Sequence, residues 1–314
     1  IGSYLVDKLV NDGHEVFVLD NLTPSGGIPF VHPGCVFINQ SIAEEQTWNQ
    51  MPNIDFDVIY HLAAQTSGEK SQYNPREDMD ANALGTLLVS RFAAENNVKH
   101  LIYMSTSAVY GPGCTDIVTE DSPPLPNSVY GVNKLSGEYF VKQAHQASGL
   151  DYTIFRLTNC YGPGEDISIM NKGMVSIFCT MALHGKVIHS KGSKDRYRNF
   201  IYVGDVINAL TLAMLNPKSY NETFLLSTGE KVTVEDLISV IINSFALPKD
   251  HPVLYDGSTS GDTFGFHADI KKIQEKLGWS PRVDIVEGIK LYSEYLETVD
   301  LSRDLKLSHP LIET

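Results

Sequence analysis

Tyr130 and Lys134 carry side chains whose types and spacing could perform acid–base chemistry. Helical periodicity over residues 128–148 predicts a helix there, and residues four apart lie on one face of a helix. A phenol with a pKa of about 10 is a weak base at neutral pH, but a nearby cation favours its phenolate form. The pair could therefore accept a proton from an alcohol during catalysis.

The spacing of this pair is not diagnostic by itself. The chain contains 15 tyrosines, and an earlier pair, Tyr4 and Lys8, has the same spacing on a predicted helix. The surroundings of the later pair are more specific, because Thr106 and Ser107 follow a buried run at 100–104. Strand ends form the ligand crevice of a doubly wound sheet, where a hydroxyl can stabilise a developing oxyanion. A turn that hydrogen-bonds its own backbone is the alternative role of these hydroxyls.

The elements expected to position these residues alternate along the first half of the chain. Short apolar runs of strand length lie at 15–20, 35–38, 57–63, 100–104 and 152–157. Longer helical patterns lie between the later runs, at 79–97 and 128–148. Buried strands that alternate with helices predict a parallel sheet covered on both faces, an α/β doubly wound fold of the Rossmann type.

After Gly162 the pattern changes. Helical stretches separated by loops rich in Gly, Ser and Pro lie at 173–184, 204–215, 234–245, 270–277 and 286–297. This half predicts a smaller C-terminal α/β lobe that returns in part to the sheet of the first half.

Gly2 and Asp20 fit the start of a dinucleotide-binding unit. They lie 18 residues apart, close to the spacing of about 20 between the glycine turn and the acidic residue of that unit. Such a fold begins with a strand, a glycine-rich turn and a helix, whereas this sequence opens on the helix. The first strand and the glycine turn are therefore expected to be missing from the given chain.

The composition excludes several classes of partner. The 314 residues are 42% hydrophobic and 20% charged, with a formal net charge of −14. Nucleic acids and anionic membranes need basic surfaces, so we expect neither as a partner. The four cysteines lack metal-site spacing and are few enough for a reducing cytoplasm. The cysteine spacing therefore predicts no bound metal. No apolar run reaches the roughly 18 residues of a membrane span and no signal peptide opens the chain, so a cytoplasmic protein is expected.

In combination and order, these motifs resemble those of the extended short-chain dehydrogenase/reductases, and within them the NAD-dependent sugar-nucleotide epimerases and dehydratases. The resemblance covers nearly the whole chain and implies that Thr106, Tyr130 and Lys134 are the catalytic residues. It also implies NAD as the cofactor. The residues implied to bind NAD are Gly2, Asp20, Asn21, Ser41, Ile42, Leu62, Ala63, Ala64, Gln65, Asn82, Tyr130 and Lys134.

The same resemblance implies a sugar-nucleotide substrate, with a UDP-hexose as first choice. Asn159 is similar to the asparagine that holds the sugar-nucleotide phosphates, and Arg198 to the arginine that grips the diphosphate. Many relatives carry a second diphosphate arginine in the stretch that here, at 259–262, reads Thr-Ser-Gly-Asp. We expect Arg196 to supply that charge, because guanidinium groups suit phosphate oxygens. Ser107 is also expected to contact the substrate.

The residues after Thr106 bear on the reaction. The family resemblance implies a shared oxidation at the sugar C4, after which 4,6-dehydratases use an Asp-Glu pair directly after the threonine. Here Ser107 and Ala108 stand at those positions, so elimination lacks an acid and a base. We therefore expect epimerisation at C4 through a transient 4-keto sugar. A dehydratase or keto-sugar reductase of the same family, or a non-catalytic nucleotide-binding or scaffold protein on this fold, are the alternatives.

The change of pattern after Gly162 and the family resemblance together predict the domain organisation. We expect an NAD-binding domain at 1–161 and about 196–229, a substrate-binding lobe at 162–195 and about 230–300, and a tail at 301–314. The resemblance further implies a homodimer formed through a four-helix bundle of the helices near 79–97 and 128–148. Ser41 and Asn199 stand where relatives commonly carry Asp, which leaves the identity of the sugar nucleotide open.

Overall fold

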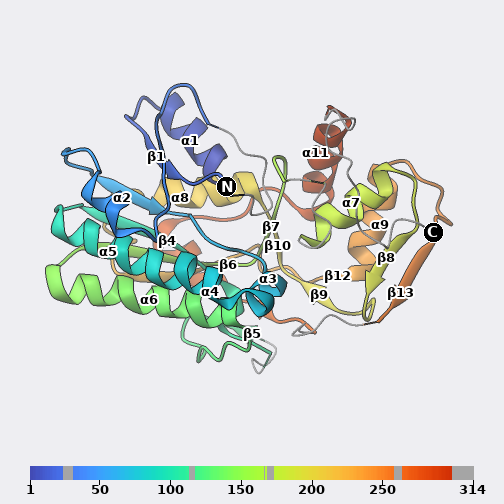
Figure 1. The fold of residues 1–314 in the computed structure, drawn as a ribbon. Helices are drawn as coiled ribbons and strands as arrows, with labels where there is room; N and C mark the ends of the chain where they lie inside the picture. The colour runs from blue at the N-terminus through green and yellow to red at the C-terminus, as the bar shows by residue number, and fades with distance from the viewer. Residues whose placement is uncertain (24–30, 113–116, 166, 168–172, 258–263, 299–314) are drawn as a thin grey trace.

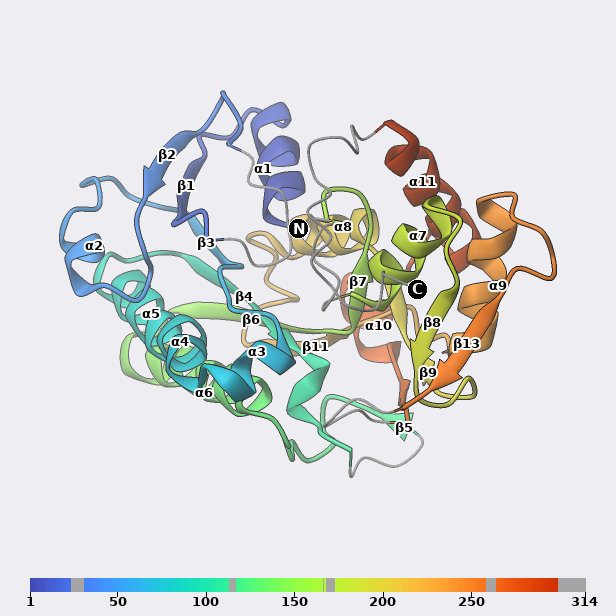
Figure 2. The same cartoon turned by 45° about the vertical axis from the view of Figure 1, so that its right-hand side comes forward.

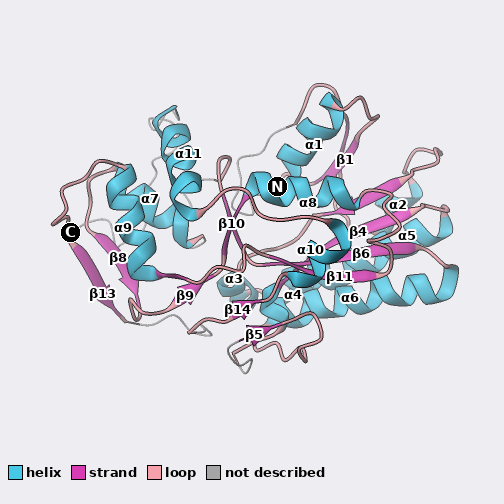
Figure 3. Cartoon of the chain, turned by 180° about the vertical axis from the view of Figure 1, so that it is seen from behind, coloured by secondary structure: helices cyan, strands magenta, loops and turns pink. Residues whose placement is uncertain are grey.

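A parallel sheet of four strands forms the centre of the first lobe. The computed structural model describes residues 1–23, 31–112, 117–165, 167, 173–257 and 264–298. The strands are β3 (Val58–His61), β4 (His100–Thr106), β6 (Asp151–Leu157) and β11 (Glu222–Leu226), in the order β11-β6-β4-β3. Figures 1 and 3 show α5 (Gly85–Glu95) and α6 (Val129–Ser148) on one face and α8 (Val203–Ala213) on the other. This coverage explains why β4 and β6 are buried along almost their whole length.

A second parallel pair, β1 (Phe17–Asp20) and β2 (Val36–Asn39), lies beside this sheet. Within the described part of the chain, β1 is not hydrogen-bonded to β3, so the predicted sheet occurs as two hydrogen-bonded groups. Helix α1 (Gly2–Asn11) covers this region, and its Leu5 and Leu9 share a buried core with residues of α8. The expected parallel α/β architecture is thus present, with each predicted strand of the first half in place.

Helix α6 has clear sequence signals at both ends. The Ser128 side chain accepts a hydrogen bond from the Gly131 amide at 3.1 Å, which satisfies a backbone donor of the first turn. The helix ends at Gly149, whose φ of 80° is unfavourable for residues with a side chain. In between, Gly137 lets the helix approach β4, because a Cβ atom there would lie 2.3 Å from the Tyr103 hydroxyl oxygen.

The helix predicted at 79–97 differs in detail. The chain forms α4 (Pro75–Asp78), then a π-helical segment η1 (Met79–Leu84), and then α5. A π-helical turn holds more residues per turn than an α-helix and is frequent at functional sites. Sequence periodicity placed the later part of this element correctly and did not reveal the wider turn.

The second lobe lies beside the first (Figures 1 and 2) and has a hydrophobic core of its own. Its helices are α7 (Met174–Leu183), α9 (Val234–Ser244) and α11 (Ile285–Thr298). They pack beside the parallel strands β8 (Ile188–Lys191) and β13 (Val253–Asp256). Buried residues that line this core include Ile241, Ile289 and Tyr292.

Short strand pairs join distant parts of the chain. They are β7 (Asn159–Tyr161) with β10 (Phe200–Tyr202), β9 (Tyr197–Arg198) with β12 (Val232–Thr233), and β5 (Ile117–Val118) with β14 (His267–Ala268). The remaining helices are α2 (Glu45–Asn49), α3 (Gly68–Tyr73), η2 (Ser107–Val109) and α10 (Lys271–Leu277). These strand pairs were not predicted, because two- or three-residue strands have no periodicity to detect.

None of the described helices combines the length and the apolar character that crossing a membrane requires. Among the described residues, no group of His, Cys, Asp and Glu side chains is arranged to hold a metal ion. Of the four cysteines, Cys114 lies outside the described residues, and Cys35, Cys160 and Cys179 are free thiols.

Candidate functional site

Thr106 is the last residue of β4 and caps the short helix η2. Its hydroxyl oxygen accepts a hydrogen bond from the Ala108 amide at 3.2 Å. The hydroxyl thus has the alternative role given above, in which it hydrogen-bonds the backbone of its own turn. The same hydroxyl also hydrogen-bonds the Tyr130 phenol. Thr106 therefore serves both the turn and the Tyr130 side chain. Ser107, the first residue of η2, is partly buried beside it.

A close backbone approach brings Tyr130 to this turn. Gly131 packs against the turn so tightly that a Cβ atom there would lie 2.7 Å from the Ala108 carbonyl oxygen. A larger residue would push the first turn of α6 away from η2. The glycine after the tyrosine therefore fixes the distance between the phenol and the Thr106 hydroxyl.

Burial dominates the acidity of both members of the tyrosine–lysine pair. Burial raises the pKa of Tyr130 to about 12, although the hydrogen bond with Thr106 opposes that rise. Burial also lowers the pKa of Lys134 to about 7, while the charges of Glu138 and Asp78 oppose that fall. The sequence predicts that Lys134 favours the phenolate form of Tyr130. Burial outweighs that effect in the structure, because it disfavours the charged forms of both side chains.

Lys134 lies in an aromatic and polar enclosure. Only 2% of its surface is exposed, and its ammonium sits 4.3 Å from the centre of the Tyr103 ring. The His61 ring also stacks on Tyr103, with the ring centres 5.2 Å apart. Burial, with the neighbouring Lys134 charge, lowers the pKa of His61 to about 3, so the imidazole is neutral. Lys134 is thus surrounded by groups that carry no competing positive charge.

The neutral His61 belongs to a chain of hydrogen bonds below the site. Thr86 donates its hydroxyl hydrogen to the Asn82 carbonyl oxygen at 2.8 Å. The His61 Nε2 atom, 2.8 Å from the Thr86 oxygen, must therefore carry the hydrogen and donate it. These bonds tie β3 to the π-helical segment η1.

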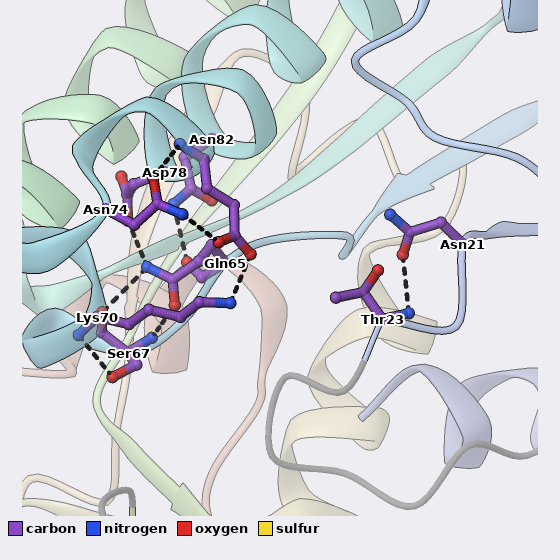
Figure 4. A network of polar contacts seen from close by, with 9 residues as sticks. Asn21, Thr23, Gln65, Ser67, Lys70, Asn74, Asp78 and Asn82 are labelled. Atoms are coloured by element: carbon purple, nitrogen blue, oxygen red, sulfur yellow. Dashed lines mark hydrogen bonds and ion pairs between the residues drawn. The ribbon is translucent and has the colours of Figure 1, made fainter.

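The loop after β3 holds the residues implied to line NAD. Leu62, Ala63 and Ala64 are partly buried, and Gln65 is buried. Asn82 donates its side-chain amide to the Gln65 carbonyl oxygen at 2.8 Å, which brings these two predicted residues together (Figure 4). The buried Asn82 Oδ1 atom has no hydrogen-bond partner among the described residues. An unsatisfied buried acceptor next to this loop fits a site that a ligand donor completes.

The predicted ribose-binding residues lie at the carboxyl end of β1. The Asp20 carboxylate accepts the Leu22 amide at 2.6 Å and the Asn21 side chain accepts the Thr23 amide at 3.0 Å, so both shape the turn. Both side chains are exposed, which leaves further oxygen atoms accessible to hydroxyl donors. Gly2 is exposed as well, with no atom within 4 Å of where a Cβ would lie.

Ser41 and Ile42 follow β2. The Ser41 hydroxyl oxygen accepts the Ala43 amide at 3.2 Å. Ile42 packs tightly on Gly85 at the start of α5, where a Cβ atom would come within 2.6 Å of its side chain. Ile42 therefore anchors the loop to α5.

The structure also brings two substrate candidates together. Leu157 pairs with Thr106 at the carboxyl ends of β6 and β4, and Asn159 follows two residues later. Asn159 therefore lies at the same end of the sheet as Thr106. Both its backbone amide and its side-chain amide donate to the Asn199 carbonyl oxygen, at 3.1 and 3.3 Å. Arg198 precedes that residue. Burial and the nearby Arg196 lower the pKa of Arg198 to about 10, so an anion would be well placed to stabilise its charge.

Arg196 has a different environment. It is buried, and its guanidinium donates to the carbonyl oxygens of Ser193 (3.1 Å) and Lys191. These bonds hold the loop that follows β8, so phosphate binding by Arg196 remains a prediction. The segment 259–262, in which the second diphosphate arginine of relatives would stand, lies outside the described residues.

Five buried polar residues next to the site are not among those predicted from the sequence. Glu138 pairs with Arg156 at 2.8 Å and accepts the Ser105 hydroxyl at 2.6 Å; all three residues are buried. Asp78 and Asn133, also buried, are bonded to each other at 2.7 Å. The spacing of Glu138 four residues after Lys134, and of Asp78 four before Asn82, is the signal that could have identified them.

Two surface cavities occur away from these residues. One, of about 240 Å³, lies between α2 and α5 beside Trp48 and Arg91. The other, of about 390 Å³, lies beside His267 and Lys271. Neither is lined by a residue predicted to bind cofactor or substrate.

Comparison with known proteins gives consistent results. The model of the NAD dependent epimerase/dehydratase family matches residues 1–226. A putative UDP-glucose 4-epimerase of Methanocaldococcus jannaschii is 34% identical over 92% of this chain and 93% of its own length. The crystal structure of UDP-glucose 4-epimerase with UDP-glucose from Thermotoga maritima has a TM-score of 0.88 at 34% identity, covering 94% of this chain and 95% of its own. The NAD complex of the Thermus thermophilus enzyme of that name has a TM-score of 0.85 at 27% identity, with 95% and 96% covered.

Proposed function

Because this chain belongs to the NAD dependent epimerase/dehydratase family, an enzyme family, we propose that it inverts C4 of a hexose carried on a nucleoside diphosphate. The reaction passes through a 4-keto sugar and consumes no net oxidant. A UDP-hexose is the preferred substrate, because the similar proteins named above are UDP-glucose 4-epimerases.

One observation favours epimerisation over elimination of water. Elimination needs an acid and a base at the sugar, but Ser107 and Ala108 follow Thr106. The carboxylates whose charges act on the tyrosine–lysine pair are Asp78 and Glu138. Both are buried and hydrogen-bonded to other side chains, so neither supplies the missing acid or base.

The proposed proton transfer uses Tyr130 and Thr106. The Tyr130 phenolate accepts the proton of the sugar 4-hydroxyl, and Thr106 donates a hydrogen bond to the same oxygen. When bound, NAD would take up the C4 hydride and return it. Re-protonation of the 4-oxygen by Tyr130 closes the cycle on either face of the sugar, so no second acid is required. Lys134 provides the positive charge that favours the phenolate once a cationic ligand ring adds to it.

Several described residues fit the cofactor. Exposed Asp20 and Asn21 at the end of β1 suit ribose hydroxyls, and the unsatisfied Asn82 Oδ1 atom suits a ligand donor beside the Gln65 loop. On the substrate side, we propose that Arg198 and Asn159 hold the diphosphate, with Arg196 as a second contact. Ser107 would contact the sugar.

The same proposal assigns the two lobes and the assembly. Residues 1–161 and about 196–229 would bind NAD, and residues 162–195 and about 230–300 would bind the sugar nucleotide. We further propose a homodimer in which α5 and α6 of two copies form a four-helix bundle. Val132 and Tyr139, both exposed on α6, provide apolar surface for such a contact.

The test is a substrate panel. The full-length protein, with NAD, is incubated with UDP-, GDP-, CDP- and dTDP-hexoses, and the product sugars are resolved by chromatography. The expected result is C4 inversion with one nucleotide series and its loss, by about a thousandfold or more, in Tyr130→Phe. Turnover of a 4-keto sugar with NADH but no inversion in any series would identify a reductase and contradict the proposal.

A further inference from the structure

Asp78 is a buried carboxylate that joins two parts of the candidate site. It ends α4 and none of its surface is exposed. Its Oδ2 atom accepts a hydrogen bond from Gln65 Nε2 at 2.6 Å, and its Oδ1 atom accepts one from Asn133 Nδ2 at 2.7 Å. Both donors are neutral amides, so each carboxylate oxygen is satisfied without an ion pair.

The two donors come from the segments that carry the proposed cofactor and proton-transfer groups. Gln65 ends the loop implied to line NAD, and Asn133 lies between Tyr130 and Lys134 on α6. Figure 4 shows Asp78 and Gln65 side by side, with Asn82 on the neighbouring turn.

Both polar atoms of the Gln65 side chain, and its backbone carbonyl oxygen, form hydrogen bonds. Its side chain accepts the Ser67 amide at 2.6 Å and donates to the Ser67 carbonyl oxygen at 3.0 Å, besides donating to Asp78. Its own carbonyl oxygen accepts Asn82, one turn after Asp78. The loop conformation therefore depends on the segment that contains Asp78 and Asn82.

We propose that Asp78 is a positioning residue for the reaction, which fixes the NAD-lining loop through Gln65 relative to the Tyr130 and Lys134 helix through Asn133. Hydride transfer from C4 and proton transfer from its hydroxyl oxygen need both segments in the correct relative position, and errors of about 1 Å cost orders of magnitude in rate.

The negative charge of Asp78 gives this role a second, measurable consequence. It raises the pKa of both Lys134 and Tyr130, so removal of the charge should lower both. The other groups facing this pair are Glu138 on α6, neutral His61 on β3, and the Tyr103 phenol and Thr106 hydroxyl on β4. These remain unchanged in a variant of Asp78, so both limbs of the pH–rate profile should move to lower pH together.

The experiment compares Asp78→Ala with Asp78→Asn in the full-length protein. In Asp78→Ala both bonds are lost, and we expect kcat to fall about tenfold or more and the Kd for NAD to rise about tenfold. In Asp78→Asn the amide of Asn133 can turn round to preserve its bond, so NAD affinity should return to within about threefold, with the pH profile shifted to lower pH. Asp80→Asn, two residues away in an exposed pair with Arg76, is the control and should change neither quantity.

The outcomes separate this inference from the proposed function on which its kinetic part rests. If the wild-type protein inverts no sugar, the proposed function fails, and NAD affinity still reports on Asp78. Wild-type values of kcat and NAD affinity in Asp78→Ala would overturn the positioning role. An unshifted pH profile in Asp78→Asn would overturn it too, and this variant serves if Asp78→Ala does not fold. In the double variant Asp78→Asn/Asn133→Asp, the negative charge is restored at the neighbouring side chain. The pH–rate profile should then return toward that of the wild type.

Discussion

Replacing Lys134 with methionine should stabilise the NAD-free protein while abolishing activity. The lysine is almost completely buried, and burial lowers its pKa from 10.5 to about 7, net of the attraction to Glu138 and Asp78. At about 1.4 kcal/mol per pKa unit, holding the ammonium in this place costs up to about 5 kcal/mol below pH 7. Methionine keeps the unbranched stem against Tyr103 without the charge. The variant also loses the contact between the ammonium and the Tyr103 ring, worth about 1 kcal/mol, so its increase in the free energy of unfolding stays below about 5 kcal/mol.

The pH dependence has a definite sign. Between its folded pKa of about 7 and its ordinary value of 10.5, Lys134 binds fewer protons in the folded than in the unfolded protein. Wild-type stability from this group therefore rises with pH across that window. The advantage of Lys134→Met should shrink, from at most about 5 kcal/mol at pH 6 to about 2 kcal/mol at pH 9.

Thermal or urea unfolding of NAD-free protein at several pH values measures this effect. A gain of about 3 kcal/mol would raise the Tm of a chain this long by roughly 4 °C. Lys142→Met, a half-buried lysine two turns further along α6, should show a smaller gain. A Lys134→Met protein that is no more stable than wild type at pH 6, or whose advantage does not vary with pH, would refute the reasoning.

Three further predictions follow from individual contacts. Thr106→Val removes the hydrogen bond that lowers the pKa of the Tyr130 phenol, so the acidic limb of the pH–rate profile should move to higher pH; an unmoved limb would contradict this. Glu138→Gln leaves buried Arg156 without its counter-charge and should reduce the free energy of unfolding by about 3–5 kcal/mol, measured by urea denaturation. Gly137→Ala places a Cβ atom against the Tyr103 hydroxyl and should lower stability by about 1–3 kcal/mol, with a wild-type Tm arguing against the close contact.

Much of the fold could be predicted because local signals agree with the tertiary structure. The helix predicted at 128–148 occurs at Val129–Ser148, since Ser128 caps it and Gly149 ends it. The buried run at 100–104 is β4, extended to Thr106. Continuous apolar runs are reliable where helices cover both faces of a sheet, as they do here.

The site was only partly predictable. The family resemblance predicts Thr106, Tyr130 and Lys134 as site residues, and the structure places Thr106 beside Tyr130. The pKa values of Tyr130 and Lys134 could not be predicted, because burial depends on neighbours such as Tyr103 that are distant in sequence. Asp78 lies in a polar stretch whose composition is typical of a solvent-exposed helix N-terminus. Only the packing of α4 against α6 shows that it is enclosed.

The π-helical segment between α4 and α5 makes this part of the chain sensitive to length. Downstream of Met79–Leu84, α5 is locked against α6 and β3; upstream, α4 presents Asp78 to Asn133. Deleting one residue from the wide turn would rewind α4 by about 100°, since an α-helix has 3.6 residues per turn. Asp78 would then leave Asn133 even though no residue of the site had been exchanged. In this segment, insertions and deletions should be tolerated far less than substitutions at its exposed positions.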